Sequence, residues 1–149
     1  MADDLLAKAL TRLGQRALTE AEMREWLVKR EAEETEIERI IAFLTENLAL
    51  DDRAYALAFT ADKRDLSGWG QDRIRGDLLR RGIDRHLVEE ALAADNCESE
   101  IERAVRVLNE RGADLSDDRG RQRALGLLAR RGYEAEEAYA AIRIAARAA

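Results

Sequence analysis

The 149-residue sequence contains no proline, one cysteine and one histidine, and aromatic residues make up only 5% of it. Because proline commonly marks loops and sheet edges, its absence favours a chain of helices with short connections. A single cysteine, Cys97, cannot form an internal disulfide, and with the single histidine, His86, it cannot build a typical zinc site. We therefore expect neither a disulfide-stabilised domain nor a zinc protein.

Long apolar runs are also missing. No stretch approaches the ~20 apolar residues that a membrane-spanning helix needs. The first residues, Met-Ala-Asp-Asp, are acidic and do not resemble a signal peptide. We therefore expect a cytoplasmic protein with no membrane partner.

The residues that are abundant favour helices. Hydrophobic residues make up 46% of the chain and charged residues 38%, a balance that argues against disorder. The sequence holds 27 alanines and 22 arginines, which are both strong helix formers. At this length a chain can bury roughly two-thirds of its extended surface, which is enough for a real core. We predict an all-α fold.

The net charge of −6 is spread unevenly. Residues 1–50 hold 11 acids and 7 bases, whereas residues 98–149 hold 10 of each. A protein that binds nucleic acid mainly by counterion release should be basic. Any contact with nucleic acid must therefore come from a local arginine stripe or follow from binding to a protein partner.

Apolar residues recur at spacings of three and four almost throughout, which predicts nine short amphipathic helices. Capping boxes, in which a hydroxyl and a glutamate three residues later satisfy backbone N–H groups, mark three helix starts. They are Thr19 with Glu22, Thr35 with Glu38, and Ser99 with Glu102. Further helix N-caps are expected at Asp51 or Asp52 and at Asp84, and helix ends at Gly82 and Gly132.

The nine helices repeat in threes. A shift of 50 residues places Leu78–Ile83 (LLRRGI) on Leu128–Tyr133 (LARRGY), and a shift of 51 relates the first third more weakly. We predict three tandem three-helix units, residues 1–50, 51–97 and 98–149. Because one small unit buries little core alone, stacked neighbours extend it, which predicts an elongated, curved helical-repeat molecule.

Catalytic patterns are absent from the sequence. His86 stands alone and is expected to be a surface or half-buried helical residue, and Cys97 has no histidine or second cysteine beside it. The pairs Asp51-Asp52 and Asp117-Asp118 could hold a metal, but both precede helices, so capping is the favoured role. Gly68-Trp69-Gly70 lacks the lysine of a phosphate loop and is expected to be a turn. We expect no catalytic residue, no metal site and no cofactor.

Arginines are the remaining candidates for binding. Guanidinium groups suit carboxylates and phosphates equally well, and several arginines recur 50 residues apart. The predicted partner-binding residues are Arg64, Arg73, Arg75, Arg80, Arg81, Arg123, Arg130 and Arg131. The same repetition fits a structural role, because cations near a helix C-terminus stabilise the helix.

The central third carries a long motif of specific residues. They are Leu50–Ala56 (LDDRAYA), Phe59, Arg64, Gly68–Ile74 (GWGQDRI), Leu78 and Arg81–Ile83 (RGI). This motif resembles that of the RecX family, whose members regulate the recombinase RecA. Arg123, Leu128 and Arg131–Tyr133 look like the family's C-terminal repeat, and Thr19–Met23 with Leu27 resembles its N-terminal unit. The likeness covers nearly the whole chain.

The resemblance implies a modular all-helical protein that lies in the groove of the RecA filament on single-stranded DNA. Such a protein inhibits RecA's ATPase, recombinase and coprotease activities and is not itself an enzyme. By this likeness Arg64, Arg73 and Arg81 contact the filament. The likeness gives the remaining motif positions structural roles as helix start, core or turn. They are Asp51, Asp52, Arg53, Tyr55, Phe59, Gly70, Ile74, Gly82 and Gly132.

Two other functions stay open from the sequence. The chain could be a helical-repeat adaptor for another protein, without a RecA or DNA role. It could also be a helix-turn-helix DNA-binding protein, although the acidic total disfavours this. Under the RecA hypothesis the partners are the RecA filament and single-stranded DNA within it, and we expect a monomer.

Overall fold

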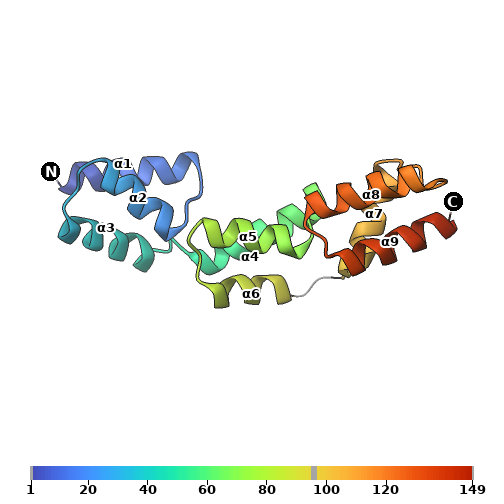
Figure 1. The fold of residues 1–149 in the computed structure, drawn as a ribbon. Coiled ribbons are helices and arrows are strands. Elements are labelled where there is room, and N and C mark those ends of the chain that lie inside the picture. Colours follow the sequence, from blue (N-terminus) through green and yellow to red (C-terminus); the bar gives the residue numbers. More distant parts are fainter. Residues whose placement is uncertain (1, 95–96, 149) are drawn as a thin grey trace. The chain divides into compact units, whose positions relative to one another are not determined.

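The computed structural model describes residues 2–94 and 97–148, and within them the chain forms nine α-helices and no strand (Figure 1). The predicted all-α class is confirmed. Residues 95 and 96, near the predicted boundary between the second and third units, lie outside the described residues. The helices are α1 (Ala2–Gln15), α2 (Glu20–Lys29), α3 (Glu34–Glu46), α4 (Asp52–Ser67), α5 (Gln71–Arg80), α6 (Arg85–Ala93), α7 (Glu100–Glu110), α8 (Asp118–Arg131) and α9 (Ala135–Ala148).

Most of the predicted helix starts are confirmed by their caps. Thr19 forms a complete capping box with Glu22 at the start of α2. Ser99 accepts a hydrogen bond from the Glu102 N–H at α7, and Asp117 accepts one from the Gly120 N–H at α8. In each case the side chain satisfies a backbone donor that the helix itself leaves unpaired.

The predicted capping box at Thr35 and Glu38 is wrong. Helix α3 begins at Glu34, its N-cap residue is Glu33, and that residue makes no side-chain cap bond. Thr35 therefore lies inside the first turn. That turn carries Glu34 and Glu36, whose charges favour a helix N-terminus, so this helix starts without a hydroxyl cap.

Two glycines end helices in the left-handed conformation. Gly132 follows α8 with φ 96°, and Gly82 follows α5 with φ 85°. Residues with a side chain adopt such angles at a cost, so glycine is the favoured residue there. Both predicted helix ends are confirmed.

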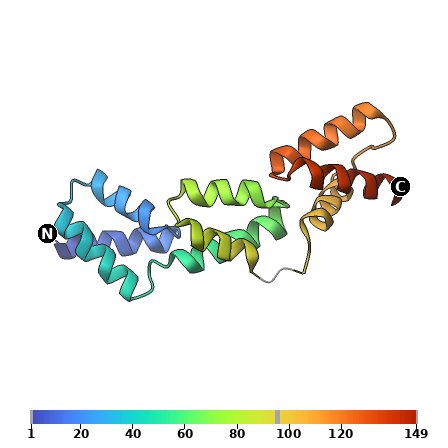
Figure 2. The ribbon, with the colours of Figure 1, turned by 60° about the horizontal axis from the view of Figure 1, so that its bottom comes forward.

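The chain divides into two compact units, Met1–Ala58 with Leu78–Ala91 and Phe59–Asp77 with Leu92–Ala149. The core of the first unit gathers side chains of α1, α2 and α3 around Met23, Leu27 and Leu44, which are fully buried. In the second unit α7 and α8 both pack against α9, around Leu108, Leu128 and Ala141 (Figures 1 and 2). Helices α4, α5 and α6 each contribute to both units. The three boundaries drawn from the sequence therefore stay a prediction.

Candidate functional site

A junction between helix ends lies in the first unit, where the start of α2 meets the end of α5. The Thr19 hydroxyl donates a 2.7 Å hydrogen bond to the Arg81 carbonyl oxygen. The Glu20 N–H donates to the Asp52 carboxylate at 2.9 Å, so the first residue of α4 caps α2. We call these four residues, together with the side chains that contact Arg81, the first junction.

The Arg81 side chain fixes this junction. Its guanidinium donates to the Tyr55 hydroxyl at 3.0 Å and lies 3.4 Å from the Glu22 carboxylate. Burial raises the pKa of Tyr55, while the positive charge of Arg81 opposes that rise. Burial also raises the pKa of Asp52, although the Glu20 N–H favours its ionised form. The motif residues Asp52, Tyr55 and Arg81 thus meet in one network of internal contacts.

The second unit contains an equivalent junction, where the start of α5 meets the end of α8. The Gly70 N–H donates to the Arg131 carbonyl at 2.7 Å, and the Asp72 N–H donates to the Gly132 carbonyl at 3.1 Å. The Gln71 N–H donates to the Glu100 carboxylate at 2.8 Å, so the first residue of α7 caps α5. We call the residues that form these three hydrogen bonds the second junction.

The end of α4 is held by side chains of the same unit. Arg131 donates to the Ser67 carbonyl at 2.5 Å, and the Tyr133 hydroxyl donates to the Gly68 carbonyl at 2.7 Å. Arg106 donates to the carbonyl of Arg64 at 3.0 Å. Helix C-termini leave such carbonyls unpaired, so these donors complete α4. Burial raises the pKa of Tyr133, which keeps its hydroxyl protonated as a donor.

A buried charge cluster lies beside these bonds. Arg103 is 0% exposed and pairs with Glu98 at 3.3 Å and with Glu100. Arg106 pairs with Glu98 at 2.8 Å, and this hydrogen bond is the main reason that the pKa of Glu98 is lowered. The sequence analysis did not find Arg103, since an arginine in an amphipathic pattern is assigned to the solvent face.

Two further predicted arginines also make internal contacts. Arg64 is 7% exposed and donates to the Leu92 carbonyl at 2.8 Å, and its burial lowers the pKa of its guanidinium. Arg73 lies over the Trp69 ring at 3.9 Å and donates to the Arg130 carbonyl at 3.2 Å. Lys63 lies 4.6 Å from the same ring, and Phe59 meets it edge to face. The Gly-Trp-Gly turn is therefore packed between cations.

Three predicted arginines are exposed and unpaired. The guanidinium groups of Arg80, Arg123 and Arg130 make no hydrogen bond or ion pair with the residues that the structure describes. Arg80 ends α5, and Arg130 stands 50 residues later near the end of α8. We call these three residues the open arginines. Arg75 differs from them because it pairs with Asp72 at 3.1 Å.

The open arginines on α8 line a cavity of about 390 Å³. Arg123 and Arg130 share its wall with Arg111, which the sequence analysis did not single out. Asp114 also lines this cavity, and hydrogen bonds from Ser116 lower the pKa of that carboxyl, as does the charge of Arg123 to a smaller extent. Three guanidinium groups and one carboxylate therefore line the cavity.

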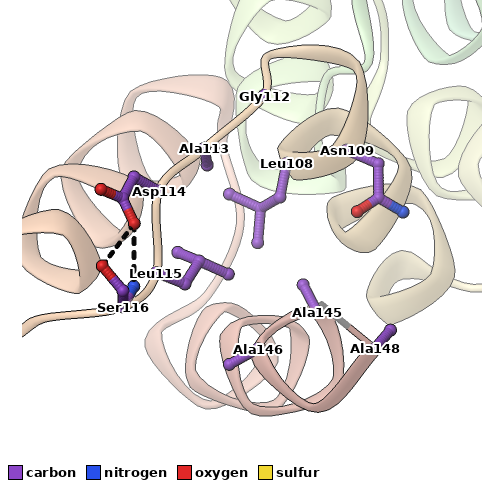
Figure 3. Close-up of a pocket in the computed structure, with 10 residues that line it drawn as sticks. All are labelled: Leu108, Asn109, Gly112, Ala113, Asp114, Leu115, Ser116, Ala145, Ala146 and Ala148. Atoms are coloured by element: carbon purple, nitrogen blue, oxygen red, sulfur yellow. Dashed lines mark hydrogen bonds between the residues drawn. The ribbon is translucent and has the colours of Figure 1, made fainter.

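A second cavity of about 590 Å³ shares Ala113 and Asp114 with the first. In Figure 3, Leu108, Leu115 and Ala145 point into it from α7, the following loop and α9. Asp114 instead turns to Ser116, with which it forms two hydrogen bonds. Both apolar and polar residues line this cavity, and Asp114 is the one titratable side chain among the described residues in its lining.

The remaining motif residues lie within or close to the two junctions. Asp51 accepts a bond from the Ala54 N–H and so caps α4, as expected, and Arg53 pairs with Glu90 at 2.5 Å. Ile74 is fully buried. Among the described residues there is no group of three or more side chains that could hold a metal. No helix in that part of the chain is long and apolar enough to cross a membrane.

Comparisons with known proteins agree with the motif analysis. Residues 6–44 match the model of the first three-helix domain of RecX, and residues 51–92 match that of the second. The regulatory protein RecX of Deinococcus radiodurans is 38% identical over 140 residues, which cover 93% of this chain and 67% of that protein. The regulatory protein RecX of a Mycobacterium species (strain JLS) is 31% identical, with 85% of this chain and 73% of that protein covered.

Solved structures support the same conclusion for the fold. The crystal structure of RecX from Lactobacillus salivarius superposes with a TM-score of 0.83 over 98% of this chain and 97% of that one, at 21% identity. A second crystal structure of regulatory protein RecX gives a TM-score of 0.74 at 25% identity, over 96% of this chain and 73% of that one. The chain therefore belongs to the RecX family of regulatory proteins.

Proposed function

We propose that this chain binds the filament that RecA forms on single-stranded DNA and inhibits the ATPase, recombinase and coprotease activities of RecA. It acts as a binding protein and not as an enzyme, in the cytoplasm and as a monomer. Family membership supports RecA as the target. The three three-helix units drawn from the sequence, residues 1–50, 51–97 and 98–149, belong to this proposal as its repeated binding modules.

The observation that carries the proposal is the repeated pair Arg80 and Arg130. Arg80 ends α5 and Arg130 lies near the end of α8, the second helices of the second and third units predicted from the sequence. Both residues are exposed, and neither guanidinium has a hydrogen-bond partner among the described residues. An exposed guanidinium without a partner is available for a carboxylate or a phosphate of a filament. Arg123 adds a third such group on α8.

Three other arginines, Arg64, Arg81 and Arg131, have a different part in the proposal, and we call them the junction arginines. They already donate to carbonyls or to a tyrosine hydroxyl within the chain. They would have to break these bonds to bind a partner, and each broken bond has a cost. We therefore assign filament contact to the open arginines and assign the shape of the binding surface to the junction arginines.

Repeated weak contacts give this arrangement its strength. When one contact forms, the next becomes intramolecular, so several arginines on one chain bind a periodic filament more tightly than each alone. A regulator that prefers one filament state shifts the filament population by its difference in affinity. Inhibition then needs no catalytic group.

The test is the rate at which RecA hydrolyses ATP on single-stranded DNA while this protein is titrated in. We expect the rate to fall at well below one copy per RecA, because a regulator that stops filament growth acts on many subunits. An unchanged rate up to an excess of folded, helical protein would remove the RecA role and leave the adaptor hypothesis.

A further inference from the structure

The cavity lined by Arg111, Arg123 and Arg130, which we call the arginine cavity, lies within the second compact unit. All three residues are exposed, and none of their guanidinium groups has a hydrogen-bond or ion-pair partner among the described residues. A guanidinium fork binds the paired oxygens of a carboxylate or phosphate through parallel N–H groups. The cavity therefore holds donors that the fold itself does not use.

Gly126 keeps the α8 wall of this cavity open. It lies between Arg123 and Arg130 on one face of the helix, at spacings of three and four residues. A Cβ atom at this position would meet only the Arg130 guanidinium, at 3.2 Å, whereas at Gly120 it would collide with the Asp114 carbonyl oxygen. Packing thus requires a glycine at Gly120 but not at Gly126. Because a glycine inside a helix is destabilising relative to alanine, Gly126 preserves space at a cost in stability.

Asp114 adds an acceptor to the arginine cavity. The N–H and the hydroxyl of Ser116 both donate to Oδ1 of Asp114 (Figure 3). Oδ2 has no hydrogen-bond donor within the part of the chain that the structure describes. The cavity therefore suits a ligand that carries carboxylates and N–H groups together. A peptide does so, whereas the backbone of single-stranded DNA has acceptors and no donor.

The second cavity, of about 590 Å³, provides an apolar surface beside the first. The arginine cavity lies between α8 and the loop after α7, and the second cavity lies between the same loop, α7 and α9. Leu108, Leu115 and Ala145 point into the second cavity (Figure 3). A segment that crosses this loop can therefore place an acidic side chain in one cavity and an apolar side chain in the other.

From these features we infer that the two cavities bind an acidic peptide segment of a partner protein, in which glutamates or aspartates stand beside apolar residues. Its carboxylates pair with Arg111, Arg123 and Arg130, and a backbone N–H donates to Oδ2 of Asp114. The inference rests on the proposed function for the role of Arg123 and Arg130 in partner binding. It deepens that function by naming protein carboxylates, and not DNA phosphates, as the groups that they bind.

The experiment measures the fluorescence anisotropy of a labelled peptide of about eight residues, in which a few leucines are set among glutamates, as this protein is added without RecA. We expect a Kd of about 100 μM. A peptide with glutamine in place of glutamate should bind about ten-fold more weakly, because it cannot form ion pairs. A peptide with serine in place of leucine should lose a similar factor, because it leaves the second cavity unfilled.

Arg123→Gln with Arg130→Gln should weaken binding of the glutamate peptide about ten-fold. The matched control is Arg119→Gln with Arg143→Gln, which loses the same charge at exposed positions that line neither cavity. It should bind like the wild type. Circular dichroism establishes that each variant is folded.

Gly126→Leu tests the cavity without changing any charge. The new side chain fills the space beside the arginines, so the peptide should bind about ten-fold more weakly. Gly14→Leu is its control, because nothing lies within 4 Å of the carbon added there, and it should bind like the wild type. If Gly126→Leu does not fold, Gly126→Ala takes its place, with an expected loss of about three-fold.

Three results would overturn the inference. They are no binding of the glutamate peptide at about 1 mM protein, equal binding of the glutamine peptide, and displacement of the bound peptide by oligothymidylate at the same concentration of negative charge. RecA is absent from this assay. A failure here therefore leaves the ATPase test of the proposed function standing, and an unchanged ATPase rate leaves the peptide result standing.

Discussion

The two junctions join helix ends by the same plan but with different groups. In the first, a side-chain hydroxyl of Thr19 reaches the carbonyl of Arg81. In the second, the backbone N–H of Gly70 reaches the carbonyl of Arg131, which lies 50 residues after Arg81. In both junctions a carboxylate caps a helix start. Asp52, the first residue of α4, caps α2, and Glu100, the first residue of α7, caps α5.

The surroundings differ more than the bonds. Arg81 pairs with Glu22 in a half-exposed position, with 26% of its side chain accessible, whereas Arg103 beside the second junction is fully buried. Charges in water gain little from pairing, but a buried charge that loses its partner is costly. We therefore expect changes in the second junction to cost more stability than equivalent changes in the first.

The largest effect should come from Arg103→Met. The change leaves the mostly buried Glu100 carboxylate without its partner, while Glu98 keeps Arg106, and we expect the free energy of unfolding to fall by about 3 kcal/mol or more. Arg81→Met in the first junction should cost about 1 kcal/mol. Urea unfolding measures both, and equal losses would refute the difference between the junctions.

Gly70→Ala should come next. A methyl group at this position would overlap the backbone of Gly132, which forms the second junction and cannot rotate away as a side chain could. We expect a loss of about 3 kcal/mol. Gly14→Ala is the control, because nothing lies within 4 Å of its added carbon, and it should stabilise α1 by up to about 1 kcal/mol. A stable Gly70→Ala variant would show that the helix ends are not in close contact.

Tyr133→Phe and Tyr55→Phe compare how much each tyrosine hydroxyl contributes to stability. Tyr133→Phe removes the donor to the buried Gly68 carbonyl and should cost about 1–2 kcal/mol, more than Tyr55→Phe, whose hydroxyl accepts from the partly exposed Arg81. Urea unfolding at neutral pH measures the difference. A greater loss for Tyr55→Phe would reverse the comparison.

The same tyrosine predicts a pH dependence. Because burial raises the pKa of Tyr133 in the folded chain, the unfolded chain loses its proton first. The stabilisation is present below the unfolded pKa of about 10 and is lost as pH rises through the folded value. The free energy of unfolding should fall from about pH 10 upward, and less steeply in Tyr133→Phe. If the free energy of unfolding fell equally steeply with pH in Tyr133→Phe, Tyr133 would not be the cause of the pH dependence.

Thr19→Val should have the smallest effect. It removes the cap of α2 and the bond to Arg81, which we expect to cost about 1 kcal/mol. Thr19→Ser keeps the hydroxyl and should lie within a few tenths of the wild type. In the second junction no side-chain change can remove the corresponding bond, since Gly70 donates it from the backbone. A Ser variant as unstable as the Val variant would assign the effect to lost packing.

Local signals explain which parts of this fold the sequence could predict. The helices follow from apolar spacing, and the ends at Gly82 and Gly132 follow from the glycine preference for positive φ. The cap of α2 by Asp52 was not predictable, because Asp52 lies 32 positions after Glu20, whose N–H it accepts, and only tertiary packing brings them together. Thr35 misled because its spacing to Glu38 fits a capping box that α3 does not use.

The candidate site shows the same limit. The recurrence of arginines every 50 residues predicted that they share a role, but spacing could not tell a guanidinium that holds a helix end from one that faces solvent. Burial separates Arg64 from Arg80, and that property depends on α6 and its Leu92 carbonyl. Arg103 gave no signal, since a buried arginine breaks the pattern by which cores are recognised.

The central claim is that the open arginines contact the filament and that the junction arginines do not. The most direct test compares inhibition of the RecA ATPase by the wild type and by Arg80→Gln with Arg123→Gln and Arg130→Gln. The control variant carries Arg85→Gln, Arg119→Gln and Arg143→Gln, which lose the same charge at exposed positions. We predict that the first variant needs about ten-fold more protein for the same inhibition, while the control matches the wild type. Inhibition by the first variant at wild-type concentrations would contradict the claim.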